Sequence, residues 1–122
     1  MAPPPQPLVV NGWRIYLHAQ FLGQYEGLLD VVEKLRQADA EQYKKKKEAK
    51  PLAAITHLIF KVIPEDPGRQ EYRQGDTLGE QYKNWFRAKL FQQYSLFFRY
   101  DTKSKVIIYG WINDEDTLRL RQ

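Results

Sequence analysis

The chain has 122 residues, of which 43% are hydrophobic and 14% aromatic, so it can bury one hydrophobic core and is expected to form a single folded domain. It contains no cysteine, which excludes disulfides, thiolate metal sites and cysteine nucleophiles. Its 19 Lys and Arg outnumber its 15 Asp and Glu, and the net charge of +4 mildly favours a polyanionic partner.

The N-terminal segment MAPPPQPLVV contains four prolines and lacks the basic region and apolar stretch of a signal peptide. No apolar run along the chain is long enough to span a bilayer. We therefore expect a cytoplasmic protein with no membrane partner. Residues 1–8 are predicted to form a flexible, proline-rich arm, and residues 9–122 a single domain.

The first strand is predicted in the sequence VVNGWRIYLHA, which follows the arm. Apolar side chains alternate there with polar ones, as in a strand with one buried face: Trp13, Ile15 and Leu17 against Arg14, Tyr16 and His18. Histidine is the side chain best suited to proton transfer near neutral pH. His18, on the polar side, is therefore a candidate catalytic residue.

Two amphipathic helices are predicted after this strand. In the first, from Phe21 to about Gln37, apolar residues recur at spacings of three and four. The second has an apolar side over residues 52–62 and a basic first half, YKKKKEAK. Pro51 lies between its two halves and is expected to kink or restart the helix.

The second helix contains two features with a structural and a functional interpretation. The run from Lys44 to Lys47 is typical of a solvated helix face, and contact with RNA phosphates or the ribosome, through Lys44 and Lys47, is the alternative. His57 stands within the apolar run AAITHLIF, which favours a packed helix residue over a catalyst.

A long loop and a three-stranded meander are predicted for the rest of the chain. Residues 64–84 are rich in Pro, Gly and charge and show no clear periodicity. Three strand patterns then follow, WFRAKLF, YSLFFRY and KVIIYGWI, with short polar connections between them. This spacing predicts an antiparallel meander.

Alternation along these strands predicts one face that packs on the helices and an opposite face that mixes cations with aromatic rings. The predicted residues of that opposite face are Trp85, Arg87, Lys89, Phe97, Arg99, Tyr109 and Trp111. Cations bind phosphates, and aromatic rings stack on unpaired bases at roughly 1 to 3 kcal/mol per base. The face is therefore either a platform for single-stranded nucleic acid or a second small core covered by the arm or the long loop.

No metal or cofactor is expected from the sequence. The two histidines have no clustered carboxylates beside them. The sequence also contains no phosphate-binding loop, no GxSxG elbow and no dinucleotide fingerprint.

Four segments resemble the YhaV family of toxins, in the same order and with compatible spacing. They are VNGWRIYLHAQF, RQGDTLG at residues 73–79, NWFRAK, and LFFRYDTKSKVIIYGWINDEDTLR. The last is the most specific, because an apolar strand that ends in GWINDEDTLR rarely arises by chance. The resemblance covers nearly the whole chain after the arm.

The resemblance implies a RelE-like toxin fold of α+β class. In that fold, two N-terminal helices pack on a small, twisted, mainly antiparallel sheet, in the order strand, two helices, three strands. It also implies an endoribonuclease that cuts messenger RNA, associates with the ribosome and inhibits translation and growth. The implied partner is a PrlF-type antitoxin with an AbrB-like domain, and operator DNA would be bound only through the antitoxin complex.

The superfamily also implies a metal-independent reaction in which the RNA 2′-hydroxyl attacks the adjacent phosphate. Arg87 and Lys89 match the basic pair of NWFRAK: Arg87 would stabilise the phosphate, and Lys89 would stabilise it or transfer a proton. Arg99 is a further candidate stabiliser. For each of these cations, an exposed position on a strand without a catalytic role is the alternative.

The motif from Asn113 to Arg119 also matches the family. Asp114 or Thr117 could cap a short helix, since such side chains accept N–H groups at helix ends, and Arg119 could contact RNA.

Two departures from the family pattern lead us to expect reduced activity. Relatives usually carry Arg after the tyrosine of YxLFFRY, where this chain has Ser95, and they usually continue beyond DExTLR into a helix bearing DAY. Loss of one preorganised cation typically lowers a rate about 100- to 1000-fold. The alternatives to a working toxin are therefore a degenerate or truncated relative that binds antitoxin or RNA without cleaving, and a non-toxin structural or nucleic-acid-binding protein.

Overall fold

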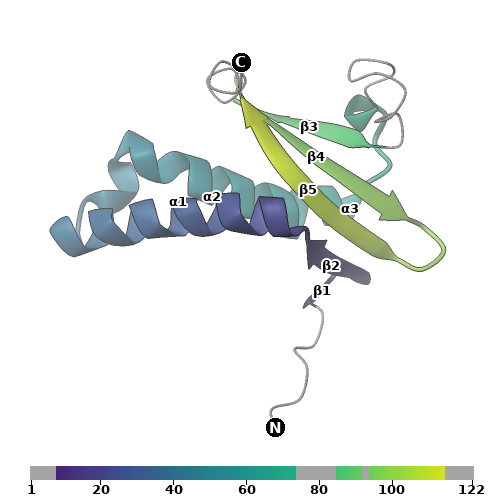
Figure 1. The fold of residues 1–122 in the computed structure, drawn as a ribbon, viewed down its shortest axis with the longest axis horizontal. Helices are drawn as coiled ribbons and strands as arrows, with labels where there is room; N and C mark the ends of the chain where they lie inside the picture. Colours follow the sequence, from purple (N-terminus) through teal and green to yellow (C-terminus); the bar gives the residue numbers. More distant parts are fainter. Residues whose placement is uncertain (1–7, 74–84, 92–93, 115–122) are drawn as a thin grey trace, which may run out of the picture.

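A computed structural model describes residues 8–73, 85–91 and 94–114 of the chain. They form an α+β fold in which helices cover one face of a five-stranded sheet with the strand order β1-β2-β5-β4-β3 (Figure 1). The α+β class predicted from the sequence is confirmed. Among these residues, no helix has the length and apolar character needed to cross a membrane.

The predicted first strand is a β-hairpin, formed by β1 (Leu8–Val10) and β2 (Trp13–Leu17). Asn11 and Gly12 connect the strands, and both have positive φ, 51° and 83°. A two-residue turn of this kind suits the twist of a hairpin, and Asn-Gly is its strongest sequence signal. The predicted strand is therefore confirmed as β2, whereas the residues before the turn, predicted as part of the same strand, belong to the separate strand β1. Leu8, assigned to the arm, pairs with Ile15.

Helix α1 (Ala19–Ala38) confirms the first predicted helix. It begins at His18, whose Nδ1 accepts the backbone N–H of Gln20 at 3.2 Å and so pairs one of the N–H groups left free at a helix start. Phe21 is fully buried against the sheet, while most of the helix surface faces solvent.

The second helical segment is interrupted at both ends. Its basic half forms two short 3-10 turns, η1 (Tyr43–Lys45) and η2 (Lys47–Ala49), so the prediction of a helix there was wrong. Pro51 lies in the first turn of α2 (Lys50–His57), a position where its missing N–H costs nothing, and the predicted restart is confirmed. The helix continues as a π-helical turn, η3 (Leu58–Val62), into α3 (Ile63–Glu65), and a 3-10 turn, η4 (Gln70–Tyr72), follows.

The π-helical turn links the helices to the sheet. Within it, the Ile63 N–H donates to the carbonyl of Leu58, five residues back, instead of to Ile59. The Ile59 carbonyl accepts the Tyr109 hydroxyl instead, at 2.6 Å.

The predicted meander is confirmed as β3 (Phe86–Leu90), β4 (Tyr94–Asp101) and β5 (Val106–Asp114). Strand β2 pairs with β5 in parallel, which brings Leu17 opposite Tyr109 although 91 residues lie between them in the chain. Because β2 ends at Leu17, the side-chain amide of Gln24 on α1 pairs with the next part of the β5 edge. It donates to the Ile112 carbonyl and accepts the Ile112 N–H, both at 2.8 Å.

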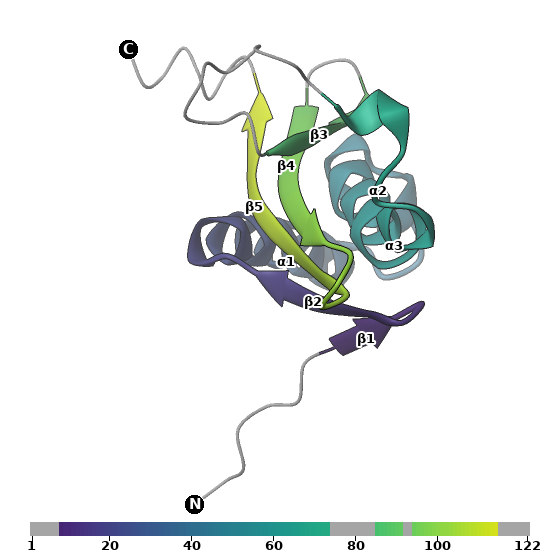
Figure 2. The same ribbon diagram turned by 90° about the vertical axis from the view of Figure 1, so that its right-hand side faces the viewer.

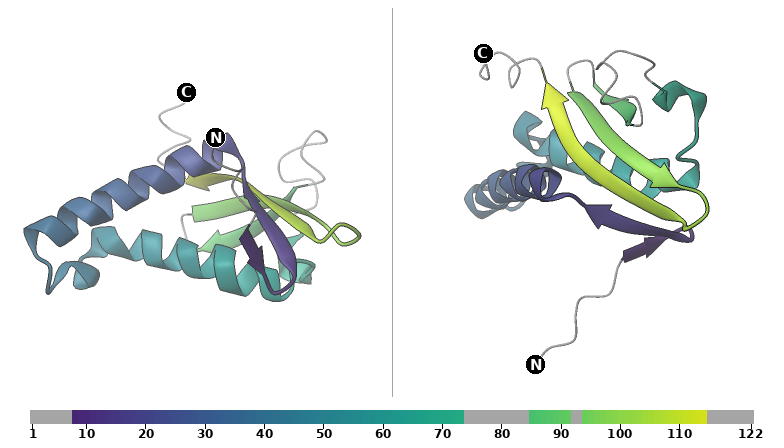
Figure 3. Two further views of the ribbon diagram at one scale, coloured as in Figure 1. Left: turned by 90° about the horizontal axis from the view of Figure 1, so that it is seen from below. Right: turned by 45° about the vertical axis from the view of Figure 1, so that its right-hand side comes forward.

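The hydrophobic core lies between the helices and one face of the sheet (Figures 2 and 3). Helix α1 contributes Phe21, and the second helical segment contributes Ile55, Ile59 and Ile63. The strands contribute a larger set: Trp13, Ile15, Ala88, Leu90, Leu96, Phe98, Ile107, Tyr109 and Ile112. The opposite face of the sheet, here called the open face, carries the other side chains of each strand.

A β-bulge in β5 changes which residues reach each face. Phe98 pairs with Tyr109, while the neighbouring Phe97 pairs with Trp111, so Gly110 is an extra residue. Ile107 and Tyr109 therefore face the helices, and Ile112 does so as well. The prediction that Tyr109 lies on the open face was wrong, because one extra residue inverts the alternation along a strand.

Candidate functional site

Strand β3 positions two cations on the open face. Its alternate residues Ala88 and Leu90 are buried in the core, so Arg87 and Lys89 point away from the helices. Arg87 is half-buried and Lys89 is exposed. Arg87 and Lys89 are two residues apart on one strand, so their Cα atoms lie roughly 7 Å from each other.

Strand β4 adds a third cation, which lies nearest to Arg87. Arg87 pairs with Phe97, so Arg99 lies diagonally across from Arg87, at a separation of roughly 7 to 8 Å. We call Arg87, Lys89 and Arg99 the basic cluster. Among the residues that the structure describes, no carboxylate forms an ion pair with any of them. The cluster can therefore attract and stabilise a phosphate group.

Three aromatic rings pack beside the basic cluster. Phe97 is 1% exposed and is stacked against Trp111, with ring centroids 4.7 Å apart, and Trp111 contacts Trp85 at 5.0 Å. The Arg99 guanidinium lies 5.5 Å from the Trp85 ring centroid. Phe97 therefore belongs to a small second core, and Trp85 and Trp111 are half-exposed above it.

The bulge residue makes room for this packing. A Cβ atom on Gly110 would lie 2.6 Å from the Trp85 ring, closer than real Cβ contacts. Glycine at this position therefore lets Trp85 lie against the sheet next to Arg99.

Tyr109 does not belong to this face. It is fully buried, and its hydroxyl donates to the Ile59 carbonyl. Burial raises the pKa of this hydroxyl far above its usual value. Its ring cannot stack on a nucleic-acid base, which corrects the assignment of Tyr109 to RNA binding.

His18 is not brought to the basic cluster. Its backbone N–H donates to the Tyr109 carbonyl at 2.9 Å, which places it beside β5, on the side of the sheet away from β3. Strands β5 and β4 stand between β2 and β3, so three strand spacings put His18 about 14 Å from Arg87 and Lys89. His18 therefore lies on the other side of β4 and β5 from Arg87 and Lys89.

The remaining predicted residues lie elsewhere. Lys44 and Lys47 are exposed on the 3-10 turns of the helix layer, not on the open face. His57 is exposed on α2, so the packed position expected for it is not found. Asn113 pairs with Ser95 at the end of β5, whereas Thr117 and Arg119 lie outside the described residues.

Sequence reasoning missed two exposed side chains on the open face. Tyr16, 42% exposed, and Ile108, 36% exposed, are register partners, and Ile108 also pairs with Arg99. Tyr16 therefore lies about 10 Å from Arg99, across two strand spacings. Its place on the polar side of the β2 alternation was the signal that could have identified it.

The described residues contain no group of three or more His, Asp or Glu placed to hold a metal ion. The chemistry that this face offers comes from its guanidinium and ammonium groups and its aromatic rings.

Comparison with known families gives a match over residues 15–122. The matching family is described as a toxin with endonuclease activity, of a toxin-antitoxin system. The chain is 44% identical over 115 residues to "Ribonuclease toxin YhaV" of Escherichia coli strain K12, a match that covers 93% of this chain and 75% of that protein. "Toxin YhaV" of Escherichia coli O157:H7 matches with the same identity and coverage.

Among solved structures, a chain of the toxin-antitoxin complex RelBE2 from Mycobacterium tuberculosis is similar, with a TM-score of 0.55 and 14% identity. The match covers 90% of this chain and 98% of that one. YafQ from Escherichia coli strain BL21(DE3) matches with a TM-score of 0.45 and 18% identity, over 87% and 97% of the two chains. At this identity, the RelBE2 match shows a shared fold only.

Proposed function

Because this chain belongs to the YhaV family of toxins with endonuclease activity, we propose that it is an endoribonuclease that cuts messenger RNA on the ribosome. A partner antitoxin of the PrlF type, with an AbrB-like domain, neutralises it. The observation that carries the proposal is the basic cluster, three cations without ion-pair partners among the described residues, next to two half-exposed tryptophans.

The proposed reaction needs no metal ion. The RNA 2′-hydroxyl oxygen bonds to the adjacent phosphorus, and the bond from phosphorus to the 5′-oxygen breaks. The 2′-hydroxyl proton leaves to an acceptor, and the 5′-oxygen takes up a proton. Arg87 and Arg99 stabilise the negative charge that develops on the phosphate oxygens, because guanidinium groups pair with them in fixed geometry. Lys89 adds charge or transfers a proton.

The tryptophans bind the bases next to the cleaved bond. Trp85 and Trp111 stand beside the basic cluster and stay half-exposed, so a splayed base can stack on either ring. Tyr16 lies further along the open face and can contact a more distant nucleotide. His18, far from the cluster, contributes through such a distant contact and not at the cleaved phosphate.

The test is RNA cleavage by the wild-type chain and by Arg87→Ala and Lys89→Ala. We expect the wild-type chain to slow growth when induced and to fragment transcripts, and each variant to cleave purified RNA about 100- to 1000-fold more slowly. Lys34→Ala, which removes an exposed lysine on α1, is the matched control and should cleave normally. Circular dichroism shows whether each variant is folded. Normal growth with intact transcripts, at confirmed high expression of the wild-type chain, would overturn the proposal.

One observation favours a second candidate, a relative that binds RNA or antitoxin without cleaving. Ser95 stands where the family pattern has arginine, and it lies on the open face directly between Lys89 and Asn113. The substituted position thus adjoins the basic cluster. In this second candidate, the remaining cations hold RNA but leave too little charge at the phosphate for reaction.

A further inference from the structure

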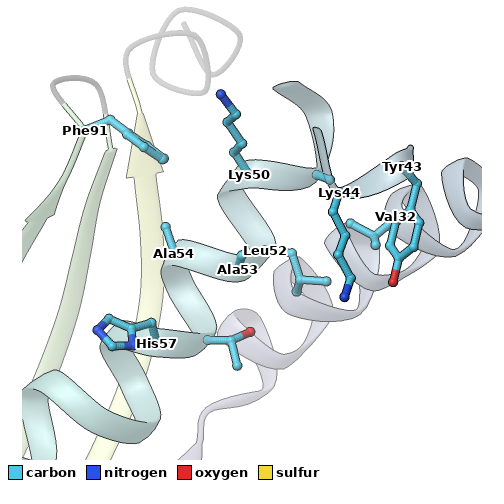
Figure 4. A pocket seen from close by; sticks show the side chains of 11 residues that line it. Val32, Tyr43, Lys44, Lys50, Leu52, Ala53, Ala54, His57 and Phe91 are labelled. Atoms are coloured by element: carbon cyan, nitrogen blue, oxygen red, sulfur yellow. The ribbon is translucent and has the colours of Figure 1, made fainter. Parts of the chain in front are cut away.

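An apolar groove lies on the helix layer, away from the open face (Figure 4). It has a volume of about 880 Å³, within the range of specific binding sites. Its lining comes from α1, from the second helical segment and from Phe91 after β3: Val32, Tyr43, Lys44, Ala49, Lys50, Leu52, Ala53, Ala54, Thr56, His57 and Phe91. The small alanine side chains leave room for another chain to approach closely.

Phe91 is an unusual residue at the edge of this groove. Its side chain is 55% exposed, and its φ of 54° lies in the left-handed region that bulky residues rarely adopt. Its ring contacts Tyr94, with centroids 6.2 Å apart, and extends the groove toward a second hollow that also includes Lys47 and Lys50. A large ring held in this conformation at the surface offers an apolar contact to a partner.

Two lysines, Lys44 and Lys50, form part of the lining of the groove. Figure 4 shows the long side chain of Lys44 beside Val32 and Leu52, the side chain of Lys50 pointing away from them, and the ring of Phe91 on the sheet side. Residues 41–50 contain five lysines and two glutamates. Within the described part of the chain, none of these lysines forms an ion pair. The groove therefore combines an apolar floor with an unneutralised positive rim.

This combination favours an acidic amphipathic helix as the occupant. Such a helix buries its aliphatic face in a groove between helices and leaves its carboxylates at the edges, next to the lysines. Single-stranded RNA is less well matched, because successive bases stack on aromatic rings that lie close together. The two rings of the lining, Tyr43 and Phe91, lie on opposite sides of an aliphatic floor made by Val32, Leu52, Ala53 and Ala54 (Figure 4).

We propose that this groove docks an acidic amphipathic helix of a protein partner. Lys44, which lines the groove, and Lys47, which lines the adjoining hollow, then serve protein recognition and not RNA binding. The site lies on the other side of the sheet from the basic cluster, so a bound helix leaves the cluster uncovered. The proposal does not depend on RNA cleavage.

The test uses a fluorescein-labelled synthetic peptide of about 18 residues, with leucines on one helical face and glutamates on the other. The controls are a scrambled peptide of equal composition and a peptide with lysine in place of glutamate. We expect fluorescence anisotropy to show at least about tenfold tighter binding of the acidic amphipathic peptide than of either control.

Two substitutions of one exposed groove residue separate charge from steric fit. Ala53→Glu should weaken binding of the acidic peptide about tenfold or more, whereas Ala53→Lys should leave it unchanged or tighter. The double variant Lys44→Glu with Lys50→Glu should instead prefer the basic peptide. Lys34→Glu, a charge reversal outside the groove, should bind as wild type does.

Three results would overturn the proposal. They are equal binding of the acidic and basic peptides, equal loss of binding in Ala53→Glu and Ala53→Lys, and no detectable binding of the acidic peptide to the wild-type chain. A labelled single-stranded RNA whose binding falls in the double variant, with peptide binding unaffected, would assign the lysines to RNA instead. RNA cleavage by the same proteins distinguishes a failure of this docking proposal from a failure of the proposed ribonuclease function. Ala53→Glu should cleave RNA at the wild-type rate even though it binds the acidic peptide less tightly.

Discussion

The Tyr109 hydroxyl connects the sheet to the helix layer through a single buried hydrogen bond, to the Ile59 carbonyl. Replacement by phenylalanine keeps the ring but leaves that carbonyl unpaired, because the π-helical turn has directed the Ile63 N–H elsewhere. We expect Tyr109→Phe to lower the free energy of unfolding by about 1 to 3 kcal/mol, measured by urea denaturation. Tyr16→Phe, at an exposed tyrosine, should show no comparable loss.

The raised pKa of Tyr109 also predicts that the protein loses stability at alkaline pH. Burial raises the pKa of Tyr109, so the folded protein keeps the hydroxyl protonated where the unfolded chain, with a tyrosine pKa of about 10, already ionises. Its contribution to stability is therefore complete below about pH 10 and is lost as the pH rises further. Between about pH 8 and 11, Tyr109→Phe should lose less stability than wild type. Equal losses in both proteins would contradict this explanation.

Ser95 is the residue at which the site departs from the family pattern. Its register places it next to Lys89 on the open face, so an arginine there would join the basic cluster. If the missing cation limits the rate, Ser95→Arg should accelerate RNA cleavage about 100-fold or more, as measured in single-turnover assays. Ser95→Gln, which adds length without charge, is the control. An unchanged rate would mean that another group has replaced the arginine.

Among the elements, β5 has an edge that no strand of the described residues covers beyond the end of β2. The Gln24 amide pairs with both backbone groups of Ile112 there, as a strand would. We expect Gln24→Leu to lower the free energy of unfolding by about 1 to 3 kcal/mol and to speed hydrogen exchange at the Ile112 amide. Gln20→Leu, at an exposed position on the same helix, is the control. Unchanged exchange at Ile112 would show that the pairing has no protective role.

The elements were predicted well where short-range patterns decide them. Helix α1 and strands β3 and β4 were found from periodicity, and Pro51 was expected to restart a helix. The hairpin was missed although Asn11 and Gly12 carried its signal. The 3-10 turns at Lys44 and Lys47 have a different cause. Lysine has a good helix propensity, so a run of lysines is compatible with a helix. The path of the backbone between α1 and α2 nevertheless forms two 3-10 turns there instead of a helix.

At the scale of the whole molecule, the helices and the sheet separate two positively charged regions. The basic cluster lies on the open face, and the lysines of the groove lie on the helix layer. From the sequence alone, all of these cations were candidates for RNA binding, because the sequence does not show on which side of the fold each one lies. Packing of the helices on a single face of the sheet is what divides them.

The sequence by itself determined the α+β class, the strands that carry Arg87, Lys89 and Arg99, and the family. These depend on side-chain alternation within a strand and on motifs a few residues long, which the chain encodes locally. Only the tertiary structure decided that Tyr109 is buried, that His18 lies far from the cluster and that a groove exists. The parallel pairing of β2 with β5 joins segments that are distant in the chain. The bulge at Gly110 and the packing of α2 against α1 are contacts between whole elements. Such contacts depend on the packing of the entire core, and no local pattern records them.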